Sequence, residues 1–358
     1  MLDQLRLHRL IFKKPAGTSR GVLHSKPSWI FTYTTTSGRQ IETEFPIIPG
    51  LSPEFQDETQ YQSQLNSFLA EALTSLELWT TPAFMSSASW LQFVVKWTAY
   101  PSFIFGLEIL IFSIQAEKYP LLFDTPFTRK EQSIPINGLV WMDTQMNMRE
   151  QIQQKIAQGF KVVKLKIGAI AWEEELALIQ ELRQHFSEQQ ITVRVDANGA
   201  FSVQEALFKL EQLQDCDLHS IEQPIRVGEW EAMRELAQQS PIPIALDEEL
   251  IGRSNKEEVL NFIQPQYIIL KPSLLGGILE TQEWIQLAEE MEIGWWTTSA
   301  LESSIGLNAI SQLTSTYLPS LPQGLGTGKL YHNNLESPLL VQAGEIQYQQ
   351  DGTWETPS

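Results

Sequence analysis

The sequence is poor in cysteine and in basic residues, and both shortages narrow the possible functions. A single cysteine, Cys216, excludes an internal disulfide and a thiolate metal cluster. Lys and Arg number 25 against 43 Asp and Glu, which leaves a net charge of −18 at pH 7. Because this charge repels the phosphates of nucleic acids and of anionic lipids, we expect neither nucleic acid nor membrane as a partner.

Long apolar runs are also missing. The most apolar stretch runs from Trp90 to Ile114, but Lys96, Pro101 and Glu108 interrupt it. It therefore contains no uncharged run of the roughly 18 residues that a membrane span needs. The first residues have no apolar segment followed by a cleavage site, as a secretory signal would. We expect buried helices instead of a span, and a cytoplasmic location.

Residues 1–132 show the pattern of an α+β capping domain. Segments that alternate apolar and polar residues predict an antiparallel meander, with Ser37 and Gly38 at one turn; they are RLHRLIF, VLHSKPSWIFTYTT and RQIETEFPII. From Tyr61 onward, leucine and phenylalanine recur at helical spacing. The segment PSFIFGLEILIFSIQA then predicts a second helix, apolar on almost every face and therefore buried.

Residues 133–328 repeat a short β-branched run followed by a longer stretch rich in Glu, Leu and Ala. The strand candidates are INGLVWM, KVVKLKI, ITVRVDA, LHSIEQP, PIALDEE, QYIILKP, GWWTTSA and QGLGTGK. Eight strands that alternate with helices predict a (β/α)₈-type barrel. Residues 329–358, with a predicted hairpin at VQAGEIQYQQDGTW, are expected to return to the cap. The fold class is thus α/β.

Charged residues mark the ends of five successive predicted strands. Strands of a parallel barrel are buried on both faces, and their C-terminal ends surround the mouth where catalytic groups usually lie. In chain order the strand-end residues are Lys166, Asp196, Glu222, Asp247 and Lys271. Lys164 lies two residues before Lys166 and therefore on the same side of its strand.

Three of these residues are carboxylates on neighbouring strands, namely Asp196, Glu222 and Asp247. Converging carboxylates repel one another unless a cation lies between them, and an oxygen-only set suits Mg²⁺. We therefore expect one divalent ion. The lysines on either side, Lys166 and Lys271, are candidate bases, because a neighbouring cation disfavours a charged ammonium. A metal between opposed lysines suits removal of a proton α to a carboxylate.

The strand motifs KLKIG, RVDANGAF, SIEQPI, IALDEEL and YIILKPSLLGG resemble those of the enolase superfamily, in its muconate-lactonizing subgroup. The resemblance covers nearly the whole chain. It implies a capped barrel and a lysine base working with Mg²⁺, which is that superfamily's known pattern.

Within the subgroup the chain resembles the o-succinylbenzoate synthase family. The similar segments are PAGTSRGVL, YPSFIFGLE, TTSALESSIGL and GLGTGKLYHNNL. By this resemblance residues 16–20, with Gly17 and Arg20, correspond to a mobile cap loop that closes over the substrate. Ser299, Ser303 and Ser304 correspond to a loop that receives a substrate carboxylate.

The resemblance also implies a reaction and a role for each residue. The reaction is the syn-dehydration of 2-succinyl-6-hydroxy-2,4-cyclohexadiene-1-carboxylate to 2-succinylbenzoate in menaquinone biosynthesis, through an enediolate. Lys166 would be the acid/base and Lys271 the opposing cation. Asp196, Glu222 and Asp247 would bind Mg²⁺. Lys164 and Asn198 would support them.

Some features depart from the family pattern and leave alternatives open. Glu248 and Glu249 follow Asp247 where many relatives have Glu-Ser, and the sequence leaves the role of the extra carboxylate undecided. Dipeptide epimerases carry Asp-x-Asp on the eighth strand, where this chain has Gly324–Gly328. An N-succinylamino acid racemase remains an alternative because its substrate carries the same succinyl arm. A barrel that binds a small acid without catalysis is a further alternative, and the oligomeric state is open.

Overall fold

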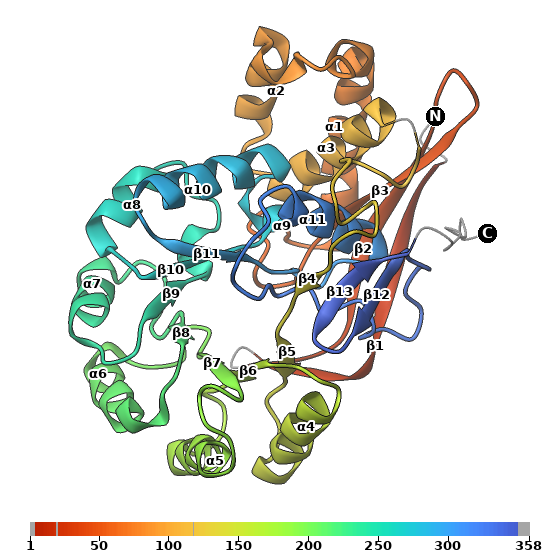
Figure 1. Ribbon diagram of the computed structural model, residues 1–358. Coiled ribbons are helices and arrows are strands. Elements are labelled where there is room, and N and C mark those ends of the chain that lie inside the picture. The colour runs from red at the N-terminus through yellow and green to blue at the C-terminus, as the bar shows by residue number, and fades with distance from the viewer. Residues whose placement is uncertain (1–3, 19–20, 117, 350–358) are drawn as a thin grey trace.

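Antiparallel strands and helices form the N-terminal part of the molecule, as the sequence patterns predicted (Figure 1). The computed structural model describes residues 4–18, 21–116 and 118–349. The N-terminal elements are β1 (Leu5–Thr18), β2 (Gly21–Thr34), β3 (Gln40–Pro46), α1 (Glu58–Trp79), η2 (Phe84–Ser86), α2 (Ala88–Trp97) and α3 (Pro101–Gln115). Strand β2 lies between β1 and β3.

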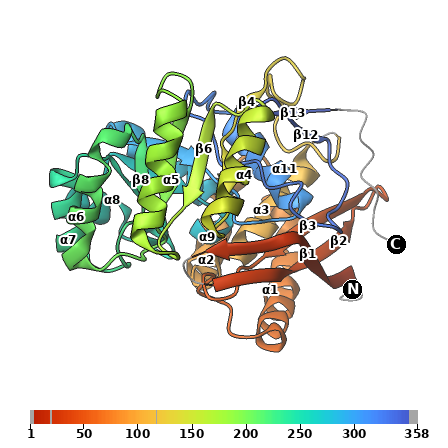
Figure 2. The ribbon, with the colours of Figure 1, turned by 90° about the horizontal axis from the view of Figure 1, so that it is seen from below.

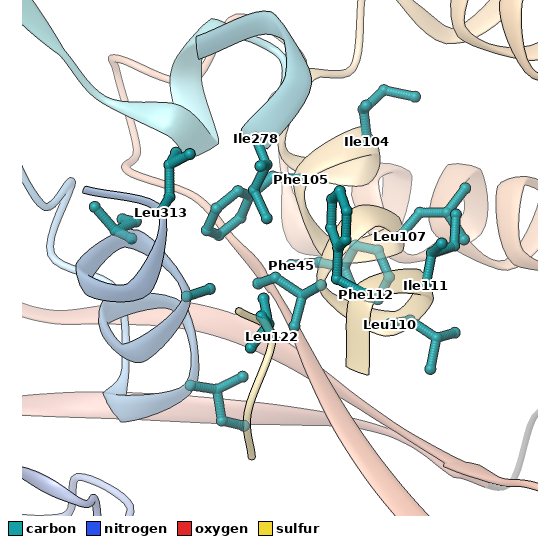
Figure 3. Close-up of a cluster of buried hydrophobic side chains, with 14 of the residues drawn as sticks. Phe45, Ile104, Phe105, Leu107, Leu110, Ile111, Phe112, Leu122, Ile278 and Leu313 are labelled. Atoms are coloured by element: carbon teal, nitrogen blue, oxygen red, sulfur yellow. The ribbon is translucent and has the colours of Figure 1, made fainter. Parts of the chain in front are cut away.

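Helix α3 is the nearly all-apolar helix of the sequence, and it is buried along most of its length. It begins at Pro101, a position where the missing N–H of proline costs no helical hydrogen bond. Its apolar side chains pack with Phe45 of β3 and with Ile278 and Leu313 from the C-terminal half of the chain (Figure 3). The burial on all sides explains why this helix lacks a polar face.

A parallel sheet forms the second part, with helices on its outer side (Figure 1). Its strands, in spatial order, are β5 (Gly138–Val140), β6 (Val162–Lys166), β7 (Thr192–Asp196), β8 (Ser220–Glu222), β9 (Ile244–Leu246), β10 (Tyr267–Leu270) and β11 (Gly294–Thr297). The helices are α4 (Gln145–Ala157), α5 (Trp172–His185), α6 (Val203–Gln212), α7 (Trp230–Gln239), α8 (Lys256–Ile263), α9 (Pro272–Leu275), α10 (Ile278–Glu290) and α11 (Ser304–Ser315), with the short η3 (Gln214–Cys216) and η4 (Glu248–Leu250).

The eighth predicted strand is much shorter than the sequence suggested. Within the described residues, QGLGTGK forms only two isolated parallel bridges, Gln323 to Ile136 and Gly324 to Thr298. These bridges connect the segment to the two ends of the parallel sheet. A Cβ atom at Gly324 would lie 2.3 Å from Thr298 Oγ1, so close approach requires glycine here. The alternating glycines that permit this approach leave few side chains to stabilise a longer strand.

The C-terminal hairpin forms as predicted, from β12 (Leu339–Gln342) and β13 (Glu345–Tyr348). Strand β13 also pairs with β4 (Ile134–Pro135), just before the parallel sheet begins. Upstream of the hairpin, Tyr331 bridges Phe12 of β1. Across the described residues, no helix is both long and apolar enough to cross a membrane.

Candidate active site

The charged strand ends meet at one edge of the parallel sheet, as the sequence predicted. In the register of the sheet, Lys166 of β6 lies beside Asp196 of β7, and Asp196 lies beside Glu222 of β8. Glu222 in turn pairs with Ala245 of β9, so Asp247 follows two residues further along. Parallel pairing of neighbouring strands is therefore what brings the three carboxylates together.

The three carboxylates are almost completely buried, and lysine ammonium groups contact each of them. Lys164 Nζ lies 2.8 Å from Asp196 Oδ2 and also contacts Glu222. Lys166 contacts Asp196, and Lys271 contacts Asp247. Buried carboxylates are costly without such cations, so the lysines and acids form one charge cluster.

The pKa values within the cluster differ sharply. Burial, followed by the charge of Asp196, raises the pKa of Glu222 well above its usual range. Burial would raise the pKa of Asp196 as well, but the ammonium groups of Lys164 and Lys166 outweigh it and hold that pKa well below normal. For Asp247 burial is likewise outweighed by Lys271, and its pKa is lowered. Glu222 is thus the carboxylate that lacks sufficient positive charge nearby.

The donor set of the cluster fits a hard divalent cation. Its three carboxylates offer only oxygen atoms, and Glu222 Oε1 is buried with no hydrogen-bond partner among the described residues. No three acidic, His or Cys side chains of the described residues already form a metal cage, since the lysine ammonium groups lie against the carboxylates. The residue types therefore match Mg²⁺, although the carboxylates contact lysines in this structure.

The two opposed lysines differ in their ionisation. Burial lowers the pKa of Lys166, and the positive charges of Lys164 and Lys271 lower it further against the opposing pull of Asp196. For Lys271 burial also disfavours the charge, but Asp247 and the neighbouring carboxylates outweigh it and raise the pKa. Lys166 is therefore the better proton acceptor, and Lys271 is the more persistent cation.

Asn198 links Lys166 to Glu248, the first of the two acidic residues that follow Asp247. The Nζ of Lys166 donates to Asn198 Oδ1 at 2.9 Å, and Asn198 Nδ2 donates to Glu248 Oε1 at 2.9 Å. Glu249 points elsewhere and accepts from the Trp230 indole at 2.7 Å. Glu248 thus belongs to the site's supporting hydrogen bonds, whereas Glu249 holds the neighbouring loop.

A cavity of about 560 Å³ opens above the charge cluster. Lys164, Lys166 and Lys271 line its floor, and Ser299 lies on its wall. The hydroxyl of Ser299 donates to Glu302 at 2.6 Å, and the residue remains beside the cavity. Of the three serines named from the sequence, Ser299 is the one that reaches this cavity.

Ser303 and Ser304 are not among the described residues that line the cavity, and their expected contact with substrate stays a prediction. Ser303 Oγ donates to Glu44 at 2.6 Å, and its backbone N–H donates to the same carboxylate at 2.8 Å. Ser304 Oγ donates to the Leu335 carbonyl at 2.6 Å. Ser303 Oγ also accepts from the Ile305 N–H at 3.2 Å and so caps the start of α11, where the first N–H groups need partners outside the helix. The Ser304 hydroxyl instead connects this helix to the Leu335 carbonyl.

The predicted cap loop differs from its expected extent. Ala16 and Gly17 belong to strand β1, and Gly17 accepts a hydrogen bond from the Met142 N–H at 3.3 Å. A Cβ atom on Gly17 would lie 2.4 Å from the Met142 carbonyl oxygen, so close packing, and not loop flexibility, explains this glycine. Arg20 lies outside the described residues.

Sequence reasoning missed the basic groups that surround the strand-end cluster. Arg194, two residues before Asp196, is buried with its guanidinium 3.9 Å from the Trp296 ring centroid. Burial lowers its pKa to about 10, partly offset by Glu222. Lys13, Lys14 and Lys329 line the cavity from segments that the strand pattern did not connect. Side chains alternate between the two faces of a strand, so Arg194, two residues before Asp196, could have been expected on the same face as Asp196. No local pattern indicated the three lysines.

Comparison with known proteins gives the family. Residues 147–352 match the family model described as enolase C-terminal domain-like. The chain is 45% identical to an o-succinylbenzoate synthase from Desulfotalea psychrophila, over 94% of this chain and 95% of the relative.

Solved structures agree with this match. The crystal structure of MenC from the same organism has a TM-score of 0.82 and 40% identity, covering 96% of this chain and 99% of the other. An L-Ala-D/L-Glu epimerase from Bacillus subtilis has a TM-score of 0.81 at 18% identity, with 98% and 96% of the chains covered, and shows the shared fold alone. The chain belongs to the enolase superfamily and, within it, to the o-succinylbenzoate synthase family.

Proposed function

We propose that this chain catalyses the dehydration of 2-succinyl-6-hydroxy-2,4-cyclohexadiene-1-carboxylate to 2-succinylbenzoate, the o-succinylbenzoate synthase step of menaquinone biosynthesis. The enzyme is then a lyase that acts on a small carboxylate. Near-full-length similarity to a curated synthase supports this reaction. The observation that carries the mechanism is the pair of opposed lysines with oppositely shifted pKa values. We also propose a cytoplasmic location, as expected for this biosynthetic step.

Lys166 acts as the acid/base in this mechanism. As a neutral amine it takes the proton from the carbon next to the ring carboxylate, and the C–H electrons move into an enediolate. The ammonium then returns the same proton to the hydroxyl group on the same face. As the enediolate collapses, the C–O bond breaks, water leaves and the ring becomes aromatic. Because the product ring is aromatic, the reaction is strongly favourable. The site therefore needs to stabilise the enediolate less than the site of an epimerase must.

Lys271 remains an ammonium on the opposite side and stabilises the negative charge of the enediolate. Its raised pKa supports this role, because a persistent cation is most effective where charge develops. Lys164 supplies a further fixed positive charge, and its pKa is raised by the buried Asp196 and Glu222 against the effect of burial. Asn198 orients the Lys166 amine through its 2.9 Å hydrogen bond.

Members of this superfamily generally use Mg²⁺, and Asp196, Glu222 and Asp247 are the side chains that would hold it here. The ion, when bound, supplies Lewis-acid stabilisation of the substrate carboxylate. The unpartnered oxygen of Glu222 supports this assignment. Arg20 and Ser299 stay proposed substrate contacts, Arg20 on the family resemblance alone and Ser299 also because it lines the cavity.

The alternative activities have weaker support. A curated L-Ala-D/L-amino acid epimerase from Maribacter is 31% identical over only 49% of this chain. The segment Gly324–Gly328 offers no carboxylate to pair with a substrate ammonium. A racemase of N-succinylamino acids is harder to separate from the synthase, since its substrates share the succinyl arm.

A direct assay distinguishes these activities. Purified protein is given the cyclohexadiene substrate or an N-succinylamino acid, each with Mg²⁺ or with a chelator. We expect rapid, Mg²⁺-dependent formation of 2-succinylbenzoate. Racemisation without dehydration would replace the proposed function, and binding without turnover of either compound would indicate a non-catalytic barrel.

A further inference from the structure

The cavity has a second group of cations, separate from the strand-end lysines. We propose that Lys13, Lys14 and Lys329 form a carboxylate subsite that binds the far end of a dicarboxylate substrate, the succinyl carboxylate of the reaction proposed above. The inference rests on that proposed function for the identity of the ligand. The subsite itself follows from charge, contacts and chain geometry in this structure.

The cavity wall has the opposite charge balance to the molecule. The chain has 43 acidic and 25 basic residues. Yet among the described residues that line the cavity there are seven lysines and no Asp or Glu. A cleft lined by one charge sign attracts ligands of the opposite charge, so the lining lysines that no carboxylate neutralises favour an anionic ligand in this cavity.

The strand-end lysines are already neutralised, but the other three are not. Lys164, Lys166 and Lys271 all contact buried carboxylates. None of Lys13, Lys14 and Lys329 forms an ion pair with a carboxylate of the described residues. The seventh lining lysine, Lys155, lies over the Phe160 ring with its Nζ 5.3 Å from the ring centroid. The three remaining ammonium groups are thus available to a ligand.

An irregularity in the β1–β2 ribbon places two of these lysines at the cavity. Figure 2 shows the ribbon extending from the N-terminal part to the barrel. The register shifts between Ile11 and Ala16, so that Lys13 and Lys14 lie in a bulged segment. Bulges redirect side chains and are frequent beside active sites.

The bulge is held in place by the segment that carries Lys329. The N–H of Lys13 donates to the Leu330 carbonyl at 2.8 Å, and the rings of Phe12 and Tyr331 lie 4.8 Å apart. Tyr331 Oη donates to the Leu301 carbonyl at 2.6 Å, on the cavity wall. Two segments more than 300 residues apart in sequence thus present three lysines to one cavity.

Lys13, Lys14 and Lys329 lie where the succinyl carboxylate is expected, and not where the ring carboxylate is expected. Proton removal next to the ring carboxylate requires that end of the substrate to lie at Lys166 and Lys271. The succinyl carboxylate must then lie away from the strand ends, where the cap contributes the lining. Val22, Leu23 and Ile48 provide an apolar surface in the same cavity for the ring and the methylene groups.

The test measures binding of two ligands that differ only at the far end. Calorimetry compares 2-succinylbenzoate with 2-butyrylbenzoate, in which a methyl group replaces the far carboxylate. The test proteins are the Lys13→Gln/Lys14→Gln double variant and Lys329→Gln. A Lys118→Gln/Lys161→Gln double variant makes the same change in net charge at exposed lysines outside the cavity lining.

We expect the Lys13/Lys14 double variant to bind 2-succinylbenzoate about tenfold more weakly, with a smaller loss in Lys329→Gln. Binding of 2-butyrylbenzoate should be unchanged, and the control should match the wild type. Equal losses for both ligands, or no loss for 2-succinylbenzoate, would overturn the subsite. Because binding is measured apart from turnover, a wild type that fails to dehydrate its substrate but still shows this selectivity would refute only the proposed function.

Discussion

The neighbouring lysines balance the negative charge of Glu222 only in part. Glu222 is therefore the carboxylate that depends most on a bound cation. Replacing Glu222 by Gln removes a charged oxygen ligand while nearly preserving shape, so we expect Mg²⁺ affinity to fall at least about tenfold and dehydration to fall with it. Calorimetric titration with Mg²⁺ measures the change. Glu175→Gln is the matched control, since Glu175 is equally buried but caps the loop at Gly168 with a 2.7 Å hydrogen bond. Unaltered Mg²⁺ binding by Glu222→Gln would refute this metal site.

His219 should make the protein sensitive to mild acid. Burial and the nearby Arg194 charge lower its pKa from 6.5 to about 4. The unfolded chain then binds a proton between pH 6.5 and 4 that the folded protein does not. The stability that depends on a neutral His219 is complete above pH 6.5 and is lost as the pH falls toward 4.

Replacing His219 by Gln, which can still hydrogen-bond to the adjacent Ser220, removes this titration. The wild type should lose about 2 kcal/mol more unfolding free energy than the variant between pH 7 and pH 5. Urea unfolding at the two pH values measures the difference. Parallel losses in the two proteins would show that His219 is not responsible.

The sequence predicted the position of a single residue correctly where the local strand pattern determines that position. Strand ends of a parallel sheet share one edge, so Asp196 and Glu222 had to be neighbours once their strands were recognised. The positions of Ser303 and Ser304 depend on contacts with distant Glu44 and Leu335, which no local pattern encodes. Their roles therefore became visible only in three dimensions.

Two buried carboxylates dock the N-terminal part onto helices of the barrel. Glu44 of β3 accepts from the N–H groups of Ser303 and Gly306 at 2.8 and 2.9 Å, at the start of α11. Glu108 of α3 contacts the N–H of Ile278 and accepts from Leu279 at 3.2 Å, at the start of α10. Negative charge at a helix N-terminus is favourable, and this adds to the hydrogen bonds of Glu44. Burial raises the pKa of Glu108 well above its usual range, so its contact with α10 rests on hydrogen bonding. This explains the acidic residue within an otherwise apolar α3.

Removing one of these contacts should destabilise the docking. We expect Glu44→Ala to lower the free energy of unfolding by about 2–4 kcal/mol, because several buried donors lose their acceptor together. Glu58→Ala is the control, since Glu58 pairs with Arg9 on the surface and should cost less than about 1 kcal/mol. Thermal and urea unfolding provide the measurement. A Glu44→Ala protein as stable as the control would disprove the docking role.

The order of strands and helices was largely predictable, because each has its own periodicity and end signals. The antiparallel meander, the seven strands of the parallel sheet and the C-terminal hairpin formed where expected. The eighth strand was overestimated, since a glycine-rich segment has little side-chain pattern and its pairing is set by Ile136 and Thr298. The bulge that presents Lys13 and Lys14 depends on Tyr331 and Leu330, which lie far along the chain.

The molecule as a whole separates its charges. A chain with a net charge of −18 has a cavity whose described lining is basic, and the buried carboxylates lie beneath that lining among their lysines. The barrel supplies the reacting groups, and the cap supplies part of the wall opposite them. Dehydration by a lysine that gains and then returns one proton is the central claim of this account.

Turnover of Lys166→Arg with saturating Mg²⁺ tests that claim most directly. Arginine keeps the positive charge but cannot be deprotonated near neutral pH, so it can no longer take the α-proton. Wild-type protein should form 2-succinylbenzoate, while Lys166→Arg, still binding Mg²⁺, should form none above background. Lys271→Arg is the comparison. It keeps the required positive charge and should retain measurable activity if the larger, planar guanidinium group is accommodated beside the substrate. Substantial turnover by Mg²⁺-bound Lys166→Arg would contradict the account, because another group would then have to move the proton.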